Sequence, residues 1–244
     1  MADDFFDPAY DERTMEDIRK SSGIENEDTI KALAESNYEF FLEHVLGLNT
    51  DSPLIQEAIR LVNNPPEQPH NNGTKIAVMA PRGHSKTYSY TVGRALYVAF
   101  TESSKRIILT SASRGQSKGI LRTIKRIIER NEMLNFLKPS PENREQLAET
   151  MDLKDDEGAW AAKSIALTTD VTMRTKTFGS SIRSEHVDYV FCDDILQDED
   201  GNRNKQREKD TYYEVISPIV ENKGGVLQVV GTPQAHDDLL MELM

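Results

Sequence analysis

The chain has 244 residues and a formal net charge of −12, with 37% hydrophobic and 29% charged residues. This composition is typical of a soluble globular protein with one sizeable core, and it argues against a disordered chain. The acidic balance is the opposite of the lysine and arginine excess that usually accompanies nucleic-acid binding. Any DNA contact is therefore expected to be local, or to be supplied by another domain or by a ring of subunits.

The sequence also bears on the compartment. No apolar run approaches the roughly 20 residues that a membrane span needs, so no membrane contact is expected. The first twelve residues, MADDFFDPAYDE, lack the basic and apolar stretches of a signal peptide. The single cysteine, Cys192, excludes an internal disulfide and a cysteine-based zinc site. These features indicate a protein of a reducing, intracellular compartment.

The first part of the chain is predicted to be an acidic arm followed by helices. Residues 1–28 are polar and acidic with few apolar anchors, so we expect a loosely held arm, with one domain over 29–244. Apolar residues recur at helical spacing over 28–46. A second helix is predicted to begin at Pro53, behind an Asp-Ser pair that can cap it. The Pro- and Asn-rich stretch 63–73 is a loop by composition.

Short apolar strands then alternate with helices. The strands are predicted at 75–80, 106–111, 163–168, 175–182, 187–192 and 225–230. The helices are predicted at 86–100, 116–130 and 202–221, the last of them broken near Pro218. This alternation, with nearly continuous apolar strands, indicates an α/β fold with a mostly parallel central sheet flanked by helices on both faces.

One segment has the context of a phosphate-binding loop. Residues 80–87, APRGHSKT, follow a predicted strand and open a predicted helix. In such a loop the backbone N–H groups and the helix dipole surround the phosphates. Lys86 would neutralise the β and γ phosphates of ATP, and the Thr87 hydroxyl would hold Mg²⁺.

The loop departs from the usual G-x-x-x-x-G-K-[ST] pattern at both glycine positions, which are Ala80 and Ser85. Gly83 supplies some of the lost backbone freedom. His84 is interpreted as a spacer in the loop, because no second histidine lies at ligand spacing. Arg82 is interpreted as a cation held near the γ-phosphate. The alternative is an ordinary strand–turn–helix with a chance Lys-Thr pair.

A strand that ends in two carboxylates follows at the distance expected for a P-loop enzyme. In VDYVFCDD (187–194), Asp193 is assigned to Mg²⁺ and Asp194 to the polarisation of the attacking water. Glu199 is a rival for the role of base, and Asp198 is a weaker one. The alternative is a strand that ends in a polar turn.

A third element is the strand that runs into Gly231-Thr232-Pro233. Thr232, at this strand end, can contact the γ-phosphate or the attacking water and so report hydrolysis to the rest of the domain. A Gly-Thr-Pro turn without such a role is the alternative.

The predicted helix 116–130 has an apolar face and a basic face. The basic face is interpreted as a solvated helix surface. It could instead contact DNA or a neighbouring subunit's nucleotide, with Arg114 or Arg122 as an arginine finger supplied in trans. Its members are Lys118, Arg122, Lys125, Arg126 and Arg130.

Together these residues resemble the ATPase domain of the large terminase subunit of tailed bacteriophages and related viruses, over about residues 35–240. PRGHSKT (81–87) looks like the family's deviant Walker A loop, which has an arginine before the lysine. VFCDDI (190–195) is similar to its Walker B strand, and VVGTPQAHDDLL (229–240) resembles its coupling motif. Gln56 lies in a segment similar to the adenine-recognising region, where a glutamine contacts the base.

The resemblance implies an ATP- and Mg²⁺-dependent motor of viral genome packaging. Such a motor docks as a ring on the portal protein, works with the small terminase subunit and drives double-stranded DNA into a procapsid. It is expected in the host cytoplasm, on the procapsid during assembly, and not in the mature virion. In isolation the chain could be a monomer.

The departures from the family pattern leave alternatives open. Ser85 replaces the usual glycine, and Asp194 stands where many members have glutamate. Family members carry a C-terminal nuclease domain, whereas this chain stops at Met244, so we expect either a motor domain separated from its nuclease or a partner of a separate nuclease. The alternative functions are another P-loop nucleic-acid translocase or helicase, and a nucleotide-binding assembly module that does not hydrolyse ATP.

Overall fold

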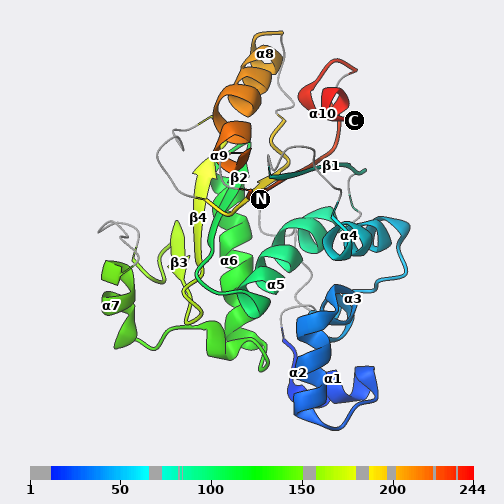
Figure 1. Cartoon of the computed structure of the whole chain (residues 1–244), viewed down its shortest axis with the longest axis vertical. Coiled ribbons are helices and arrows are strands. Elements are labelled where there is room, and N and C mark those ends of the chain that lie inside the picture. The colour runs from blue at the N-terminus through cyan, green and yellow to red at the C-terminus, as the bar shows by residue number, and fades with distance from the viewer. Residues whose placement is uncertain are drawn as a thin grey trace.

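The computed structural model describes residues 12–65, 73–81, 83, 85–150, 158–179, 187–196, 202–221, 224–234 and 236–244. Its centre is a six-stranded sheet in the order β1-β6-β5-β2-β4-β3 (Figure 1). All neighbouring strands are parallel except β3, which runs antiparallel to β4. The strands are β1 Thr74–Met79, β2 Arg106–Ser111, β3 Ser164–Ala166, β4 Thr172–Thr177, β5 Tyr189–Asp193 and β6 Val226–Gly231.

Helices cover both faces of the sheet, which confirms the predicted fold class. On one face Ile107, Leu109 and Phe191 pack with the helices that precede β1 and follow β1 and β2. On the other face Val190 and Leu227 pack with the helices that follow β5 and β6. Because alternate residues of a strand point to opposite faces, strands buried on both sides read as continuous apolar runs.

The helices occupy most of the rest of the described chain. Those before the sheet are α1 Met15–Ser22, α2 Glu27–Ser36, α3 Tyr38–Phe40, the π turn η2 Phe41–Val45, and α4 Pro53–Asn63. Between the strands are the π turn η4 Thr87–Val92, α5 Gly93–Thr101, α6 Arg114–Arg130, the 3₁₀ turn η5 Asn135–Leu137, and α7 Asn143–Thr150. After β5 come α8 Asn202–Thr211, the π turn η6 Tyr212–Ile216 and α9 Ser217–Glu221, and after β6 comes α10 Leu239–Leu243. None of the described helices has the length and hydropathy of a membrane span.

Residues 12–28 of the predicted arm form helical structure and pack on the rest of the protein. A capping box between Thr14 and Asp17 starts α1, and Ile18 is fully buried. Arg13 forms a β-bridge with Asn131 at the end of α6 and donates to the His44 carbonyl at 2.9 Å. One apolar anchor and a few backbone contacts therefore hold a segment whose composition suggested a loose one.

Two predicted helices differ in their continuity. The segment 28–46 is interrupted at Asn37, whose extended backbone ends α2 and whose side chain caps α3 by accepting from the Phe40 N–H. The helix over 202–221 is not broken at Pro218. The preceding turn is π-helical, with the Ser217 N–H donating to the Tyr212 carbonyl, and this wider turn accommodates a proline that a regular α-turn would exclude.

The strand predictions are confirmed within about two residues, except over 175–182, where the strand β4 begins earlier at Thr172. The predicted loop at 63–73 falls partly outside the described residues.

Helices α8 and α10, which follow β5 and β6, are joined by charged contacts. Lys209 pairs with Glu242, which also accepts from the Tyr213 hydroxyl at 2.9 Å. Lys205 pairs with Asp237 immediately before α10. The two chain segments that leave neighbouring strand ends therefore meet again (Figure 1).

Candidate active site

The three motifs singled out in the sequence converge at the carboxyl edge of the sheet. Strand β6 lies between β1 and β5, so the chain after β6 is inserted between the other two strand ends. The Ala80 N–H donates to the Gly231 carbonyl at 3.0 Å, and the Asp194 N–H donates to the Val230 carbonyl at 2.9 Å. In open parallel sheets this edge is where ligands bind.

Lys86 links the three strand ends. It is the first residue of the helix after β1, and only 7% of its surface is exposed. Its Nζ lies 3.1 Å from Asp194 Oδ2 and 3.2 Å from Thr232 Oγ1. The Thr232 hydroxyl in turn donates to the Ala80 carbonyl at 2.9 Å. The ammonium is thus held where a phosphate group, if bound, would find a cation already desolvated.

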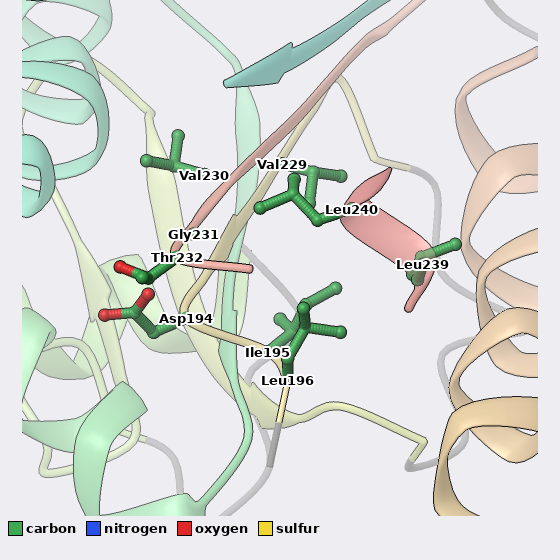
Figure 2. Close-up of a pocket in the computed structure, with 9 residues that line it drawn as sticks. All are labelled: Asp194, Ile195, Leu196, Val229, Val230, Gly231, Thr232, Leu239 and Leu240. Carbon is green, nitrogen blue, oxygen red and sulfur yellow. The ribbon is translucent and has the colours of Figure 1, made fainter. Parts of the chain in front are cut away.

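Figure 2 shows the side chains of Asp194 and Thr232 with their oxygen atoms next to each other. The same two residues line a small pocket. Apart from them and Gly231, the lining of this pocket is apolar. The apolar lining consists of Ile195, Leu196, Val229, Val230, Leu239 and Leu240. Asp194 and Thr232 therefore contact both the Lys86 ammonium and the apolar pocket.

Asp193 is a buried carboxylate held at both oxygens. The Thr87 hydroxyl donates to Oδ2 at 2.9 Å, and the Thr91 hydroxyl donates to Oδ1 at 3.0 Å. Burial raises the pKa of Asp193 to about 6, and the nearby charge of Asp194 acts in the same direction. The two hydroxyl hydrogen bonds and the charge of Lys86 oppose this rise.

The backbone of the loop explains its unusual sequence. Gly83 has φ of 80° and Ser85 has φ of 53°, both in the left-handed region that favours glycine. Ser85 thus adopts a glycine-type conformation at the position where the phosphate-loop pattern has glycine. Asp194 also lies in this region, with φ of 45°, which aspartate tolerates better than most residues.

Gln56 lies on the exposed surface of α4. Its amide nitrogen donates to Glu39 Oε1 at 2.7 Å and to the Thr50 carbonyl at 3.0 Å. A hydrogen bond of 2.8 Å from the Tyr90 hydroxyl to the Leu54 carbonyl ties the start of α4 to the helix that begins at Lys86. Gln56 is thus fixed on an element braced against the loop helix, and its contact with a base stays a prediction.

Four of the predicted residues fall outside the described parts of the chain. These are Arg82, His84, Asp198 and Glu199. The assignment of the water-activating carboxylate to Asp194 or to Glu199 therefore stays open.

The basic face of α6 is partly used within the chain. Lys125 lies 3.2 Å from the Trp160 carbonyl and 5.2 Å from the centre of its ring. Arg130 pairs with Glu12 at 3.3 Å. Arg114 and Arg122 are exposed at the surface of the helix. The predicted apolar face is confirmed, because Ile120, Leu121, Ile124, Ile127 and Ile128 are all buried.

Sequence reasoning did not single out Thr91. The available signal was its spacing of four residues from Thr87 on one helix, which places the two hydroxyls on the same side. Its relevance follows only once β5 is seen to run beside that helix.

The donor set fits Mg²⁺. Thr87 and Asp193 offer oxygen atoms, the ligands that this ion prefers, and the Thr87 proton is already directed to Asp193, which leaves its lone pairs for a cation. Among the described residues there is no group of three or more carboxylate, histidine or cysteine side chains placed to hold a metal. Mg²⁺ commonly takes one or two carboxylates and completes its shell with water and phosphate oxygens.

Comparison with solved structures relates this fold to viral terminases. The large terminase of bacteriophage HK97 superimposes with a TM-score of 0.56 and 14% identity, over 85% of this chain and 40% of that protein. An ATPase-domain mutant of the Thermus phage P74-26 large terminase superimposes with a TM-score of 0.50 and 12% identity, over 83% of this chain and 72% of that one. No family model matches the sequence, and no curated protein sequence matches it. The chain thus has the P-loop NTPase fold of the large terminase ATPase domains and spans less than half the length of the HK97 protein.

Proposed function

We propose that this chain is the ATPase motor domain of a viral terminase, which couples ATP hydrolysis to the movement of double-stranded DNA into a procapsid. The observation that carries the proposal is the position of Lys86, buried at a helix start and in contact with both Thr232 and Asp194. A desolvated ammonium at the carboxyl edge of a parallel sheet, beside two carboxylates, suits a nucleoside triphosphate better than an uncharged ligand. The fold shared with terminase ATPase domains supports the same reading.

Each residue of the site has a role in this proposal. The N–H groups of the loop that contains Gly83 and Ser85, with Arg82 and His84, would surround the phosphates, and Lys86 would exchange its contact with Asp194 for one with the β and γ phosphates. Gln56 would contact the adenine base. Mg²⁺ would neutralise phosphate charge, held by Thr87 and Asp193.

The remaining residues would act on the attacking water and on its consequences. Asp194, or Glu199 in its place, would orient and polarise the water. Thr232 contacts Lys86 and directly follows strand β6, which lies between β1 and β5. It would therefore sense whether the γ-phosphate is present and pass the change to the strand.

The partners follow from the proposed activity. A ring of copies would engage double-stranded DNA and the portal protein, with the small terminase subunit, on the procapsid in the host cytoplasm. An arginine supplied by a neighbouring copy would complete the site, with Arg114 and Arg122 as candidates because both are exposed. A ring also reconciles DNA binding with a net charge of −12, because weak contacts from several copies add up.

The test is ATP hydrolysis in the presence of Mg²⁺ by the wild type and by Lys86→Ala, at protein concentrations high enough to favour assembly. Lys31→Ala is the matched control, because Lys31 is an exposed lysine on α2. We expect turnover in the wild type and in the control, its loss in Lys86→Ala, and stimulation by duplex DNA. Turnover that survives in Lys86→Ala would overturn the assignment of the loop.

Two outcomes would favour the alternatives. Nucleotide binding that needs Lys86 but is never followed by turnover would favour the non-hydrolysing assembly module. Separation of a labelled duplex into single strands would favour a helicase, since a packaging motor moves intact duplex.

A further inference from the structure

Thr91 contacts the site from inside the protein. Its side chain is fully buried, and its hydroxyl donates to Asp193 Oδ1 at 3.0 Å. Thr87, four residues earlier on the same helix, donates to the other oxygen of that carboxylate at 2.9 Å. Because it is buried, Thr91 can act on a bound ligand only through Asp193.

Two donors on two oxygens fix the plane of a carboxylate. Rotation about the last torsion of an aspartate is otherwise broad, because that torsion has only a weak two-fold preference. Asp193 is held against this rotation from both sides. The Thr87 hydroxyl is itself a proposed Mg²⁺ ligand, so its contact with Asp193 would be affected when a metal ion binds. The contact from Thr91 is independent of what binds there.

The helical turn that carries Thr91 is itself anchored. It belongs to the π turn η4, in which the Gly93 N–H donates to the Tyr88 carbonyl. A Cβ at Gly93 would lie 2.7 Å from Leu42 Cδ2, so the helix packs closely against η2. The Tyr90 carbonyl accepts from the Gln228 side chain, and the Ser89 carbonyl accepts from the Tyr38 hydroxyl. Side chains from β6 and α3 therefore fix the backbone immediately before Thr91.

We propose that Thr91 is a positioning residue that orients the Asp193 carboxylate for Mg²⁺ at the nucleotide site. The inference rests on the proposed function, because it concerns the metal that accompanies the nucleotide. A hydroxyl that holds a metal-binding carboxylate contributes to metal affinity without touching the metal. Thr91 is therefore expected to affect the metal-dependent part of nucleotide binding and to leave the metal-free part unchanged.

The experiment compares Thr91→Val, which keeps the shape and removes the hydroxyl, with Thr91→Ser, which keeps the hydroxyl. Thr110→Val is the matched control, because Thr110 is a buried threonine on the neighbouring strand β2 whose hydroxyl has no hydrogen-bond partner within the described residues. Binding of a fluorescent, non-hydrolysable ATP analogue is measured in EDTA and then at increasing Mg²⁺ concentration. Mn²⁺ bound to the protein–nucleotide complex is counted separately by electron paramagnetic resonance.

In EDTA we expect the affinity of Thr91→Val for the analogue to lie within about twofold of the wild-type affinity. This is the variation expected when a substitution does not interact with the measured contacts. The Mg²⁺ concentration that gives half of the maximal change in analogue binding should rise by about tenfold or more, as it does for other residues that orient metal ligands. Mn²⁺ binding should weaken in parallel. Thr91→Ser should return close to the wild type, and Thr110→Val should not differ from it.

Two results would overturn the inference while the proposed function stands. One is an unchanged Mg²⁺ dependence in Thr91→Val, and the other is an equal loss of binding with and without metal, which would indicate a structural role. A wild type that binds no nucleotide under either condition would instead sink the proposed function, and the role of Thr91 with it. If Thr91→Val does not fold, Thr91→Cys replaces it, since a thiol is a weak donor of similar size.

Discussion

The Lys86 ammonium and the Asp194 carboxylate form an ion pair of 3.1 Å in which the lysine side chain is 8% exposed and the aspartate side chain 41%. The lysine proposed to meet the phosphates is thus already paired with the carboxylate proposed to activate water. A triphosphate bound as proposed would take the place of Asp194 at the ammonium. Its arrival would free the carboxylate, so the two proposed roles would be linked through one contact.

This contact makes the neutral variant Asp194→Asn informative. The amide competes less well for Lys86, so the ATP analogue should bind about two- to fivefold more tightly, the range expected when a partly exposed ion pair no longer has to be broken. Turnover should be lost if Asp194 activates water. Asp237→Asn, which removes an exposed carboxylate paired with Lys205, is the control. Weaker binding by Asp194→Asn would contradict the competition. Tighter binding with turnover intact would assign the water to Glu199.

Ser85→Gly should stabilise the protein, because a left-handed backbone costs serine more than glycine. Ser104 has nearly the same φ, 56° against 53°, and lies in the turn between α5 and β2, which makes Ser104→Gly a matched control. Each substitution should raise the free energy of unfolding by about 0.5–1 kcal/mol, the left-handed penalty less the entropy that glycine loses on folding. Only Ser85→Gly should also change nucleotide affinity. Denaturant titration and analogue binding measure the two effects, and a destabilised Ser85→Gly would show that the serine side chain is needed in the loop.

The raised pKa of Asp193 predicts a pH dependence of stability in the metal-free protein. A carboxyl whose pKa is about 6 when folded and near 4 when unfolded binds its proton more tightly in the folded state. Its ionisation therefore removes stability as pH rises from about 4 to about 6. Asp193→Asn lacks this loss. Its free energy of unfolding, relative to that of the wild type, should therefore increase by about 2 kcal/mol across that window. Unfolding in urea with EDTA, at pH values on both sides of the window, gives the comparison. A constant difference between the two proteins would mean that Asp193 is not the group that titrates.

Cys192 offers a probe of β5 next to the site. The thiol is fully buried, and burial raises its pKa well above the ordinary range. A thiol reagent should therefore label the native protein only through opening of the sheet. The ATP analogue with Mg²⁺ should slow the labelling of the wild type, because a ligand that binds only the closed form reduces opening. Lys86→Ala should show no such protection. Fast labelling of the native wild type would contradict the burial of this strand.

The sequence predicted the convergence of the motifs because parallel strands end at one edge. It did not predict that β6 lies between β1 and β5, since strand order depends on how the helices pack, and this order is what brings Thr232 to Lys86. The contact of Thr91 with Asp193 was not predicted for a related reason. Its partner Asp193 lies 102 residues away, and nothing local marks the hydroxyl as more than a helical threonine.

The local structure that the sequence did not predict has physical causes of the same kind. The segment 12–28 has a single fully buried apolar residue, Ile18, and its other contacts, such as those of Arg13 and Met15, are made with residues far along the chain. Composition cannot reveal such contacts. At Pro218 the usual rule that proline breaks a helix failed because the turn before it is π-helical.

The ion pairs between α8 and α10 join the two chain segments that leave the site. The chain that leaves Asp194 leads to α8, and the chain that leaves Thr232 leads to α10, yet Lys209–Glu242 and Lys205–Asp237 join these helices. Movement of either helix therefore bears on contacts that it shares with the other. Along the chain these joined helices follow Asp194 and Thr232, the two residues that contact the Lys86 ammonium.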